Sequence, residues 1–304
     1  MLASTEVRST VPLDIMMPFY GRVDHFKAAV ESVLKQSSRD WRLVIVDDVY
    51  PDLEPGRWAQ SLGDPRVTYL RNEVNLRPSR NYQKCVGLME SDFAVLMGCD
   101  DLMLPNYVER VTELIELFPD ASLIQPGVTT VDGEGLPNKP LADRIKRLYQ
   151  PSGARPLQLS GQALATSLLR GNWTYFPSLV WRVEELKKRV FRADLDVVQD
   201  LAMLLAITAD GGSLVLDDQV CFNYRRHEAS VSAVTGPDGS KFVQENTLFT
   251  EAAARFRAMG WTRAARAARL HLTSRLNALS ELPAALRATQ TEGRRTLLKH
   301  AFGR

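Results

Sequence analysis

The sequence predicts an α/β fold with an open, mostly parallel sheet, helices on both of its faces and a C-terminal helical extension. Three observations carry this prediction. Over the first 125 residues, short apolar runs alternate with segments of helical periodicity, as in sheets that are buried on both faces. The 304 residues are 45% apolar and 24% charged, which is typical of a folded globular chain. From Phe242 onward the pattern is helical.

The elements of the first half follow one another in βα order. Apolar runs predict strands at 13–17, 42–46 and 93–97 and a further element at 67–70, with the first strand ended by Pro18. Amphipathic periodicity predicts helices at 23–36, 79–89 and 105–118. The last of these helices has Pro105 in its first turn, a favourable position for proline.

The second half is less regular. Proline and glycine are frequent in 126–160, which we expect to be an irregular connection into a second lobe at 161–230. That lobe has predicted helices at 162–170 and 197–209 and a strand at 214–220, followed by a mobile loop at 230–240. We therefore expect residues 1–125 and 126–240 to be two halves of one domain, and 241–304 to be a basic helical extension.

Charge is unevenly distributed along the chain. The formal net charge is +2, but residues 251–304 contain ten Arg and one Lys against three Glu, a net +8. An apolar stripe in this segment is formed by Trp261, Ala265, Ala268, Leu272, Leu276 and Leu279, with Arg263, Arg266 and Arg269 opposite. We expect the stripe to pack within the chain or in a homodimer. Weak peripheral contact with an anionic membrane is the second interpretation.

Several classes of protein are excluded by composition. No apolar run reaches eighteen residues, and the first twelve residues lack the apolar core of a secretory signal. Three separated cysteines favour a reducing compartment over a disulfide framework. Nucleic-acid motifs are absent, so no nucleic-acid partner is expected. The predicted location is the cytoplasm. If the chain contacts a membrane, we expect it to do so peripherally, at the cytoplasmic face.

Acidic pairs follow two of the predicted strands. Asp47-Asp48 ends the strand at 42–46, and Asp100-Asp101 ends the strand at 93–97. In open α/β sheets, ligands bind outside the carboxyl ends of the strands. Helix capping is the alternative role, and it suits Asp101 well because the Pro105 helix follows. Two acidic pairs after two buried strands favour a ligand site over capping alone.

The ligand that fits this pattern is a nucleotide diphosphate. Carboxylates bind hard divalent cations through oxygen, often together with a phosphate, and Arg80 can neutralise a phosphate. Asp48 can accept a hydrogen bond from a base or a ribose. The chain has neither G-x-x-x-x-G-K-[ST] nor G-x-G-x-x-G, which excludes the two commoner phosphate-binding motifs.

Two stretches carry a specific resemblance. IMMPFYGRVDHFKAAVESVLKQSSRDWRLVIVDD (15–48) and NLRPSRNYQKCVGLMESDFAVLMGCDDLMLP (75–105) resemble family 2 glycosyltransferases of the GT-A fold. The resemblance is specific over 12–118 and looser through 232. It implies an inverting transferase that uses a nucleotide sugar and a divalent metal, Mg²⁺ or Mn²⁺.

The resemblance also assigns residues of the donor site. Phe19 and Tyr20 line the base pocket, Asp48 contacts the base with Asp47 beside it, and Arg80 lies near base or phosphate. The full donor set is Pro18, Phe19, Tyr20, Asp47, Asp48, Arg80, Asn81, Arg225 and Arg226, the last two facing the diphosphate. Asp100 takes the last position of the D-x-D motif and binds the metal, whereas Gly98 stands where the family often has the first Asp.

Residues of the second lobe supply the acid–base chemistry. Gln199-Asp200 looks like the family's Glu-Asp motif, in which the Asp is the general base that deprotonates the acceptor hydroxyl. The alternative is that Asp200 interacts with a helix dipole. The family's Y-R-x-H-x-x-S-x-S ending is similar to Tyr224-Arg225-Arg226-His227 with Ser230 and Ser232. The resemblance implies that His227 completes the coordination of the metal. The alternative role for His227 is that of a solvent-exposed side chain in a basic loop.

Two further residues are candidates for acceptor binding. Asn172-Trp173 precedes a predicted strand, and an exposed tryptophan there could stack on a sugar ring. A core position is the commoner role for tryptophan.

The function we expect is transfer of a sugar, with a UDP-sugar favoured as donor, to a hydroxyl of a saccharide or lipid-linked saccharide. Cell-envelope or capsule polysaccharide assembly is the expected setting, and a polyprenyl-phosphate sugar synthase is a close variant. One alternative is a sugar nucleotidyltransferase, but such an enzyme normally has a basic, Gly-rich N-terminal loop, and the corresponding segment PFYGRVDHF is not of this type. The other alternative is a catalytically inactive binding protein, because Gly98 and Gln199 replace acidic residues of the family motifs.

Overall fold

The computed structural model describes residues 13–226, 238–287 and 291–303. The strands are β1 (Leu13–Phe19), β2 (Trp41–Asp47), β3 (Val67–Arg71), β4 (Phe93–Leu96), β5 (Leu102–Met103), β6 (Leu123–Val131), β7 (Leu157–Ser160), β8 (Val180–Arg182) and β9 (Ser213–Arg225). The helices of the first half are α1 (Val23–Leu34), α2 (Glu54–Ser61), α3 (Arg77–Gly87) and α4 (Tyr107–Leu117). Those that follow are α5 (Leu141–Tyr149), α6 (Gly161–Arg170), α7 (Val183–Lys187), α8 (Gln199–Ala209), α10 (Ser240–Ala258), α11 (Thr262–Leu270), α12 (Leu272–Arg287) and α13 (Thr291–Phe302).

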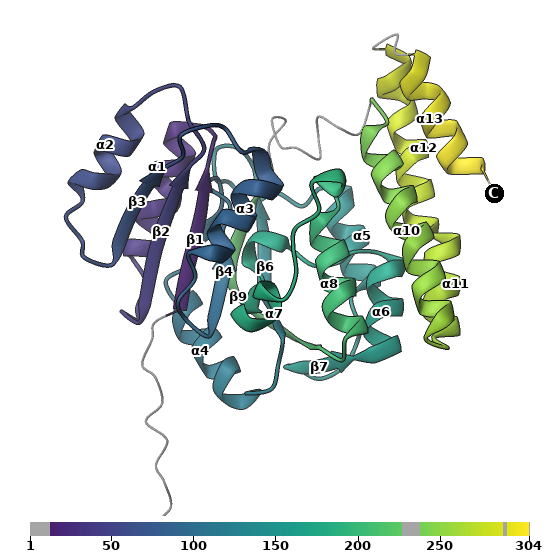
Figure 1. Ribbon diagram of the computed structural model, residues 1–304, viewed down its shortest axis with the longest axis horizontal. Helices are drawn as coiled ribbons and strands as arrows, with labels where there is room; N and C mark the ends of the chain where they lie inside the picture. The colour runs from purple at the N-terminus through teal and green to yellow at the C-terminus, as the bar shows by residue number, and fades with distance from the viewer. Residues whose placement is uncertain (1–12, 227–237, 288–290, 304) are drawn as a thin grey trace, which may run out of the picture.

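The strands of residues 13–226 form a single sheet (Figure 1). Its order is β3-β2-β1-β4-β8-β6-β9-β5, with β7 paired to β9. The first four strands pair in parallel, and β6 pairs in parallel with β9. β5, β7 and β8 pair antiparallel, which makes the second half of the sheet mixed. The predicted α/β fold with a C-terminal helical extension is confirmed.

Helices cover both faces of the sheet because β1 and β2 are apolar on both sides. Ile15 and Met17 point to the face that carries α1 and α4, where they share a core with Phe26. Met16 and Val44, one step along their strands, point to the face that carries α3, α6 and α8. Side chains that alternate along each strand therefore belong to two separate cores, one on each face, as expected for a sheet in the middle of the molecule.

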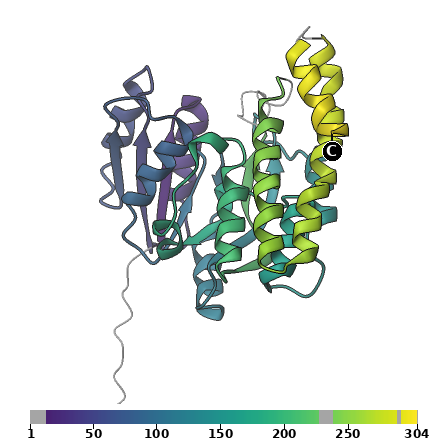
Figure 2. The ribbon, with the colours of Figure 1, turned by 45° about the vertical axis from the view of Figure 1, so that its right-hand side comes forward.

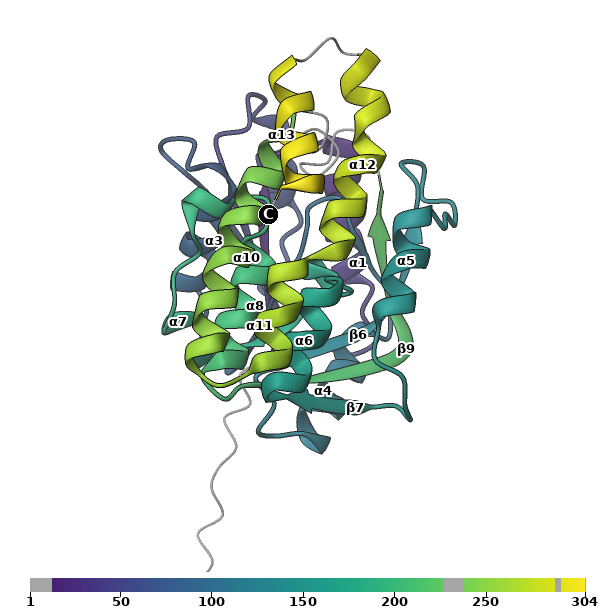
Figure 3. The ribbon, with the colours of Figure 1, turned by 90° about the vertical axis from the view of Figure 1, so that its right-hand side faces the viewer.

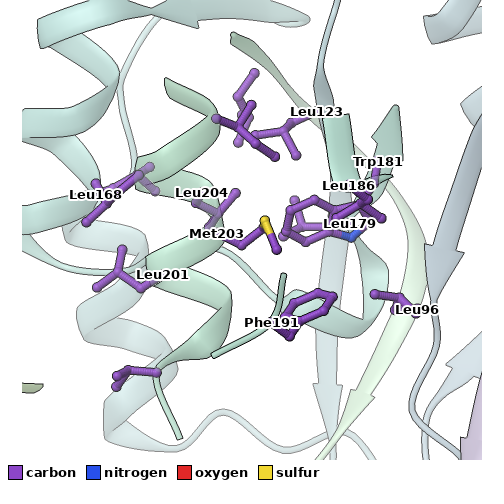
Figure 4. Close-up of a cluster of buried hydrophobic side chains, with 14 of the residues drawn as sticks. Leu96, Leu123, Leu168, Leu179, Trp181, Leu186, Phe191, Leu201, Met203 and Leu204 are labelled. Carbon is purple, nitrogen blue, oxygen red and sulfur yellow. The ribbon is translucent and has the colours of Figure 1, made fainter. Parts of the chain in front are cut away.

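The core on the second face is built around α8. Leu201, Met203 and Leu204 of this helix pack with side chains from α6, from α7 and from the sheet (Figure 4). Large apolar side chains on α8 thereby fix its axis and its depth. This packing also sets the position of the N-terminal end of the helix, at Gln199-Asp200.

In the first half, the predicted end of the first strand is wrong by two residues, and one helix was not predicted. β1 continues through Pro18 to Phe19, because β4 pairs only with Asp14–Met16 and Pro18 pairs with Val46 of β2 alone. Proline is tolerated where a strand has lost one neighbour. α2 is an additional helix, which Pro55 and Gly56 conceal in the sequence although proline is favourable in a first turn.

The interpretation of 126–160 as an irregular connection is also wrong. β6 runs through Pro126 and Gly127, where the register with β9 shifts in a bulge. A Cβ on Gly127 would lie 2.5 Å from the Gln219 carbonyl oxygen, so glycine is required by close backbone approach. The segment then forms α5 and β7, while β9 extends to Arg225, five residues beyond the predicted strand.

The C-terminal helices lie against α6 and α8 as an outer layer (Figure 2). Ala265 and Ala268 belong to the main core and Trp261 packs beside them, so this part of the stripe is buried within the chain. The stripe is interrupted between α11 and α12, where His271 has a φ of 29°, and Leu272 and Leu276 are exposed. None of the described helices is long and apolar enough to cross a bilayer.

Candidate active site

Asp47 at the end of β2 is a buried structural carboxylate. It accepts hydrogen bonds from the Tyr69 hydroxyl (2.5 Å), Arg71 Nη1 (2.6 Å) and the Tyr50 backbone N–H (2.7 Å). Burial and the bond to Asp47 raise the pKa of Tyr69 to about 12. Asp47 therefore joins β2 to β3 and holds the loop that carries Tyr50.

Asp48 is buried in the loop that follows β2. Its Oδ1 accepts from Asn72 Nδ2 and from the Leu76 backbone N–H, both at 2.7 Å, and its Oδ2 accepts from the Arg77 N–H at 2.9 Å. The carboxylate thus satisfies backbone donors at the start of α3. Two carboxylate oxygens can accept about four hydrogen bonds, so Asp48 retains the capacity for one more donor.

Aromatic side chains gather beside Asp48. Phe19 is fully buried and stacks on Phe26, with ring centroids 4.0 Å apart. Its side chain therefore belongs to the core beneath the loop and is not available to a ligand. Tyr20 is 56% exposed and meets Tyr50 edge to face at 5.8 Å. Among the predicted base-pocket residues, Tyr20 thus presents a ring to solvent, and Pro18 contributes part of its surface.

The neighbouring residues Arg80 and Asn81 point in different directions from α3. Asn81 is buried, donating to the Val46 carbonyl (3.3 Å) and accepting from Asn72 (3.0 Å). Arg80 is exposed and lines a shallow groove together with Lys84 and Arg192. Asn81 therefore fixes α3 against β2, whereas Arg80 adds to a basic outer surface.

The acidic pair after β4 folds back over Gly98. A Cβ on Gly98 would lie 2.5 Å from Asp101 Oδ2 and 2.8 Å from Asp100 Oδ1, so both oxygens face the same point. Asp101 is buried; its Oδ1 accepts from the Arg225 N–H (2.8 Å), and its Oδ2 has no hydrogen-bond donor among the described residues. Burial and the adjacent Asp100 carboxylate raise the pKa of Asp101 well above its usual value.

This geometry fits a divalent cation. Two carboxylate oxygens face one point, and one of them is a buried acceptor without a donor, which is costly unless a cation or proton compensates. Among the described residues no group of three or more His, Cys, Asp or Glu side chains is placed to hold a metal. Phosphate oxygens would therefore have to complete the coordination. The helix-capping alternative for Asp101 is wrong, because its partner is Arg225 of β9.

Arg225 is committed to the backbone around this acidic pair. Its Nε donates to the Asp100 carbonyl (2.6 Å), and its Nη1 donates to the carbonyls of Gly133 (2.9 Å) and Asp132 (3.3 Å). The side chain is 95% buried as a result. Arg225 thus ties the loop that carries the acidic pair to the residues that follow β6.

Arg226 forms a second polar cluster with residues of α5. Its Nε and Nη2 donate to the two oxygens of Asp143 at 3.1 and 2.7 Å, a bidentate ion pair. The Tyr175 hydroxyl donates to Asp143 as well (3.0 Å), and Tyr175 and Tyr224 lie 5.4 Å apart. The charges of Asp143 and Arg226 and those of the acidic pair after β4 all act on Tyr224, so the two clusters are electrostatic neighbours.

Asp200 and Asn172, predicted for different roles, lie in direct contact. Asn172 Nδ2 donates to Asp200 Oδ2 at 3.0 Å, and its Oδ1 accepts from the Thr174 hydroxyl at 2.7 Å. Burial raises the pKa of Asp200, while the Leu201 backbone N–H, Lys146 and Asn172 act in the opposite direction. The fold thus holds a carboxylate of raised pKa at the start of α8.

Lys146 of α5 stands beside this carboxylate. Its Nζ donates to the Thr174 carbonyl (2.6 Å) and lies 4.3 Å from the centre of the Tyr175 ring. Burial, with repulsion from Arg226, lowers the pKa of Lys146 to about 8, and attraction from Asp200 and Asp143 partly offsets this shift. Lys146 therefore connects the Arg226 cluster to Asp200.

Gln199, the residue that replaces the first acid of the family motif, has a structural partner. The Ser79 hydroxyl donates to Gln199 Oε1 (2.7 Å) and also contacts the Asp196 carboxylate. A neutral amide beside Asp196 avoids the like-charge repulsion that a glutamate would introduce. The contact links α3 to the end of α8 that carries Asp200.

One predicted residue is placed away from the candidate site, and another cannot be placed. Trp173 is 1% exposed in the main core, where its Nε1 donates to Ser167 Oγ (2.9 Å), so it offers no ring to an acceptor. Core packing, the commoner role of tryptophan, is the one observed. His227, with Ser230 and Ser232, lies outside the described residues, as does most of the loop predicted at 230–240.

Residues of α5 and its neighbours were not identified from sequence. Asp143 and Lys146 belong to a segment whose prolines and glycines predict a connection, and Tyr175 lies between two predicted elements. The sequence feature that could have identified them is the spacing of three residues between Asp143 and Lys146, which places a carboxylate and an ammonium group on one face of a helix.

Substitution of Gly98 tests how the acidic pair is arranged. In Gly98→Ala, the added methyl group would displace both carboxylates, so we expect Mn²⁺ to lose most of its stabilising effect on the folded protein. Thermal unfolding with and without Mn²⁺ and a nucleotide diphosphate measures this. Gly87→Ala is the control, since a Cβ there meets nothing within 4 Å. Equal Mn²⁺ effects in both variants would contradict the arrangement.

The family described as "Glycosyl transferase family 2" matches residues 14–168, just over half of the chain. The match covers β1–β4, the acidic pairs after β2 and β4, and α5. It ends before Asp200, so the second-lobe residues of the site lie beyond the matched range.

Curated relatives are similar over shorter stretches. A putative colanic acid biosynthesis glycosyl transferase, WcaA, of Escherichia coli (strain K12) is 30% identical over 31% of this chain and 34% of its own length. A putative glycosyltransferase, EpsE, of Bacillus subtilis (strain 168) is 22% identical over 41% of this chain and 45% of its length. The chain thus matches between a third and a half of these relatives.

Solved structures resemble the whole fold. S. aureus TarS 1-349 in complex with UDP-GlcNAc superimposes with a TM-score of 0.63 and 14% identity, over 94% of this chain and 90% of that one. Mannosyltransferase PcManGT from Pyrobaculum calidifontis, in complex with GDP-Man and Mn²⁺, gives a TM-score of 0.58 and 14% identity, over 95% and 85%. Taken with the family match, the fold and the acidic pairs lead to one assignment: the chain belongs to glycosyl transferase family 2.

Proposed function

We propose that this protein transfers a sugar from a nucleotide-diphosphate donor to a hydroxyl of a saccharide or lipid-linked saccharide, with inversion at the anomeric carbon. One observation carries the proposal: a polar network runs from the Asp100-Asp101 pair through Tyr224, Arg226, Asp143 and Lys146 to Asp200. Such a network supplies a site for a diphosphate at one end and a base at the other.

The donor's nucleotide would lie at the ends of β1 and β2. Tyr20 and Tyr50 offer rings for the base, and Asp48 has the capacity to accept a base N–H while it holds the start of α3. A UDP-sugar remains our first choice, supported by the UDP-GlcNAc complex of TarS, whereas PcManGT holds GDP-Man.

Asp100 and Asp101 are the residues that would hold a divalent ion, Mg²⁺ or Mn²⁺, together with the diphosphate. Such an ion, when bound, stabilises negative charge on the departing nucleoside diphosphate. Mn²⁺ in the PcManGT complex supports this cofactor. His227 remains a proposed further ligand. Arg225 acts by fixing the Asp100 backbone, and Arg226 is the proposed arginine for the diphosphate, held in place by Asp143.

Asp200 is the proposed general base. Its raised pKa suits a carboxylate that must take a proton from an acceptor hydroxyl, and Asn172 orients its Oδ2. A base that activates the acceptor on the face opposite to the leaving group gives inversion in a single displacement. Residues 1–125 would thus form the donor half and 126–240 the acceptor half, with 241–304 as the extension.

The relatives support a setting in polysaccharide assembly. WcaA is named for colanic acid biosynthesis, and EpsE is a putative glycosyltransferase. Cell-envelope or capsule synthesis at the cytoplasmic face is therefore the setting that we propose.

Lys146 provides a test through the pH profile. Its charge lowers the pKa of Asp200, so in Lys146→Met that pKa should rise further. The base is inactive when protonated, and the acidic limb of kcat/KM should move to higher pH. Lys35→Met, at the exposed residue that follows α1, is the control. An unchanged acidic limb would remove Lys146 from the control of Asp200.

A donor screen tests the proposed function as a whole. UDP-, GDP- and dTDP-sugars are compared by thermal unfolding with and without Mn²⁺, because a ligand that binds the native state raises the melting temperature. We expect one nucleotide class to stabilise the protein in a Mn²⁺-dependent manner. If donors bind without subsequent transfer to any saccharide or lipid-linked saccharide, the protein is an inactive binding protein instead.

A further inference from the structure

The amphipathic helix α5 has its faces reversed. Helices of globular proteins normally turn their apolar stripe to the core. In α5 the polar residues Asp143 and Lys146 face inward, whereas Leu141, Ile145 and Leu148 are 68%, 40% and 82% exposed. Figure 3 shows α5 at the outer edge of the molecule.

The active site fixes this orientation. Asp143 is held by the ion pair with Arg226 and by Tyr175, and Lys146 is held by the Thr174 carbonyl. Turning the apolar face inward would bring both charges to solvent and break these bonds. The exposed leucines are therefore the consequence of a polar face that serves the site, and another surface must cover them.

The apolar surface continues beyond α5. Leu136 precedes the helix and is exposed, and Tyr149 at its end packs on Gly171, where a Cβ would lie 2.9 Å from the Tyr149 ring. The next residue back, Arg170, accepts a hydrogen bond through its carbonyl from Thr273 of α12 (2.7 Å).

The start of α12 is joined to the segment beside Tyr149 through the bond to Arg170. Leu272 and Leu276, on either side of Thr273 in sequence, are the exposed part of the predicted C-terminal stripe.

Basic residues flank this face. Lys139, Arg144 and Arg147 are exposed, and the two arginines lie on one side of the α5 apolar stripe, at positions 144 and 147 of the same helix. The acidic residue of the helix, Asp143, is already neutralised by Arg226, and Glu134 is the exposed acid nearby in sequence. Leucines between basic residues are the composition of a helix that lies in a membrane interface.

We propose that the α5 face, formed by Leu136, Leu141, Ile145, Leu148 and Tyr149, docks on an anionic membrane surface. The apolar side chains enter the interface, and Arg144 and Arg147 contact anionic headgroups. Since the inner face of α5 carries Asp143 and Lys146, docking places the acceptor side of the site at the membrane. Resting on the proposed function, this selects a lipid-linked saccharide as the acceptor.

Charge favours a membrane over a second copy of the chain. A two-fold interface through α5 would bring the same patch of both copies together. Both copies would then bring the same net positive patch, with Arg144 and Arg147, into one contact, and like charges repel across an interface. Anionic headgroups complement the same residues.

Co-sedimentation with vesicles tests the surface. The full chain is mixed with vesicles of equimolar phosphatidylcholine and phosphatidylglycerol, or of phosphatidylcholine alone, at low and high salt. We expect binding to the anionic vesicles that weakens with salt. The double variant Leu141→Gln, Leu148→Gln should bind about tenfold more weakly, because it removes apolar area from the interface.

Matched variants separate this proposal from general effects. Leu117→Gln changes an equally exposed leucine on α4 and should leave vesicle binding unchanged. Arg144→Gln with Arg147→Gln should reduce the salt dependence, whereas Arg57→Gln on α2 should not. Vesicle binding that survives the double leucine variant would overturn the proposal. So would a wild-type chain that ignores anionic vesicles, or one that forms a dimer through these leucines.

Donor binding keeps the two proposals distinguishable. Both leucines lie on the outer face, so the Mn²⁺-dependent stabilisation by a donor should be the same in the double variant and the wild type. If vesicles bind through α5 and no nucleotide sugar binds, the proposed function fails while the membrane surface stands.

Discussion

Asp200→Asn should lower kcat by about 10²-fold or more, with little change in donor affinity. Asn keeps the size of the side chain and can still pair with Asn172, but it cannot accept a proton. The donor is assigned to the ends of β1, β2 and β4, so its binding does not depend on this carboxylate. Steady-state kinetics with a saturating acceptor, together with a donor titration, measure the two effects.

Stability separates a catalytic role from a structural one. The folded-state pKa of Asp200 is raised, so at neutral pH its ionised form destabilises the folded chain relative to the unfolded one. Removal of the charge should leave the free energy of unfolding unchanged or increase it. Asp194→Asn, an exposed neighbour paired with Arg192, is the control and should retain activity. A loss of stability in Asp200→Asn with normal turnover would leave only the helix-dipole role.

Asp100→Asn should abolish Mn²⁺-dependent donor binding and lower transfer by about 10²-fold or more, since metal stabilisation of a leaving group is worth several kcal/mol. The Asp100 carbonyl, which accepts from Arg225, is unchanged, so the fold should persist. Donor titrations with and without Mn²⁺ measure the effect.

Asp92→Asn provides the matched control for this variant. Asp92 is an exposed aspartate just before β4, and its replacement should leave Mn²⁺-dependent binding unchanged. If Asp100→Asn binds donor and metal normally, the metal site lies elsewhere in the chain.

The first half of the fold was predictable because each of its elements is locally encoded. The apolar run at 42–46 corresponds to β2. The helical periodicity of Phe26, Val30 and Val33 correctly predicted the buried face of α1. A parallel sheet brings strand ends together, which is why the acidic residues after β2 and β4 could be recognised as one region.

Elements that depend on distant partners could not be predicted. β6 passes through Pro126 and Gly127 only because β9 accommodates a bulge there. α5 turns its charged face inward because Arg226 and Tyr175, far along the chain, bind Asp143. Local breakers and polarity favour a loop in both places, and tertiary contacts override them.

The roles of individual side chains also depend on contacts with residues that are distant in the sequence. Arg225 was a candidate through the resemblance to the family's Y-R-x-H ending, and Trp173 because an exposed tryptophan can stack on a sugar ring. The structure gives the first to backbone carbonyls and the second to the core. Asp200 and Asn172, in contrast, were predicted separately, and the structure brings their side chains into a direct hydrogen bond.

A single displacement by an acceptor hydroxyl that Asp200 activates would invert the anomeric carbon, so the configuration of the product distinguishes it from other routes. Proton NMR can follow the anomeric signal of the first sugar product formed from a nucleotide sugar, before mutarotation in the case of a free sugar. We expect a product of the opposite anomeric configuration to the donor, formed by the wild type and strongly reduced in Asp200→Asn. A product that retains the donor's configuration would contradict a single displacement with Asp200 as base.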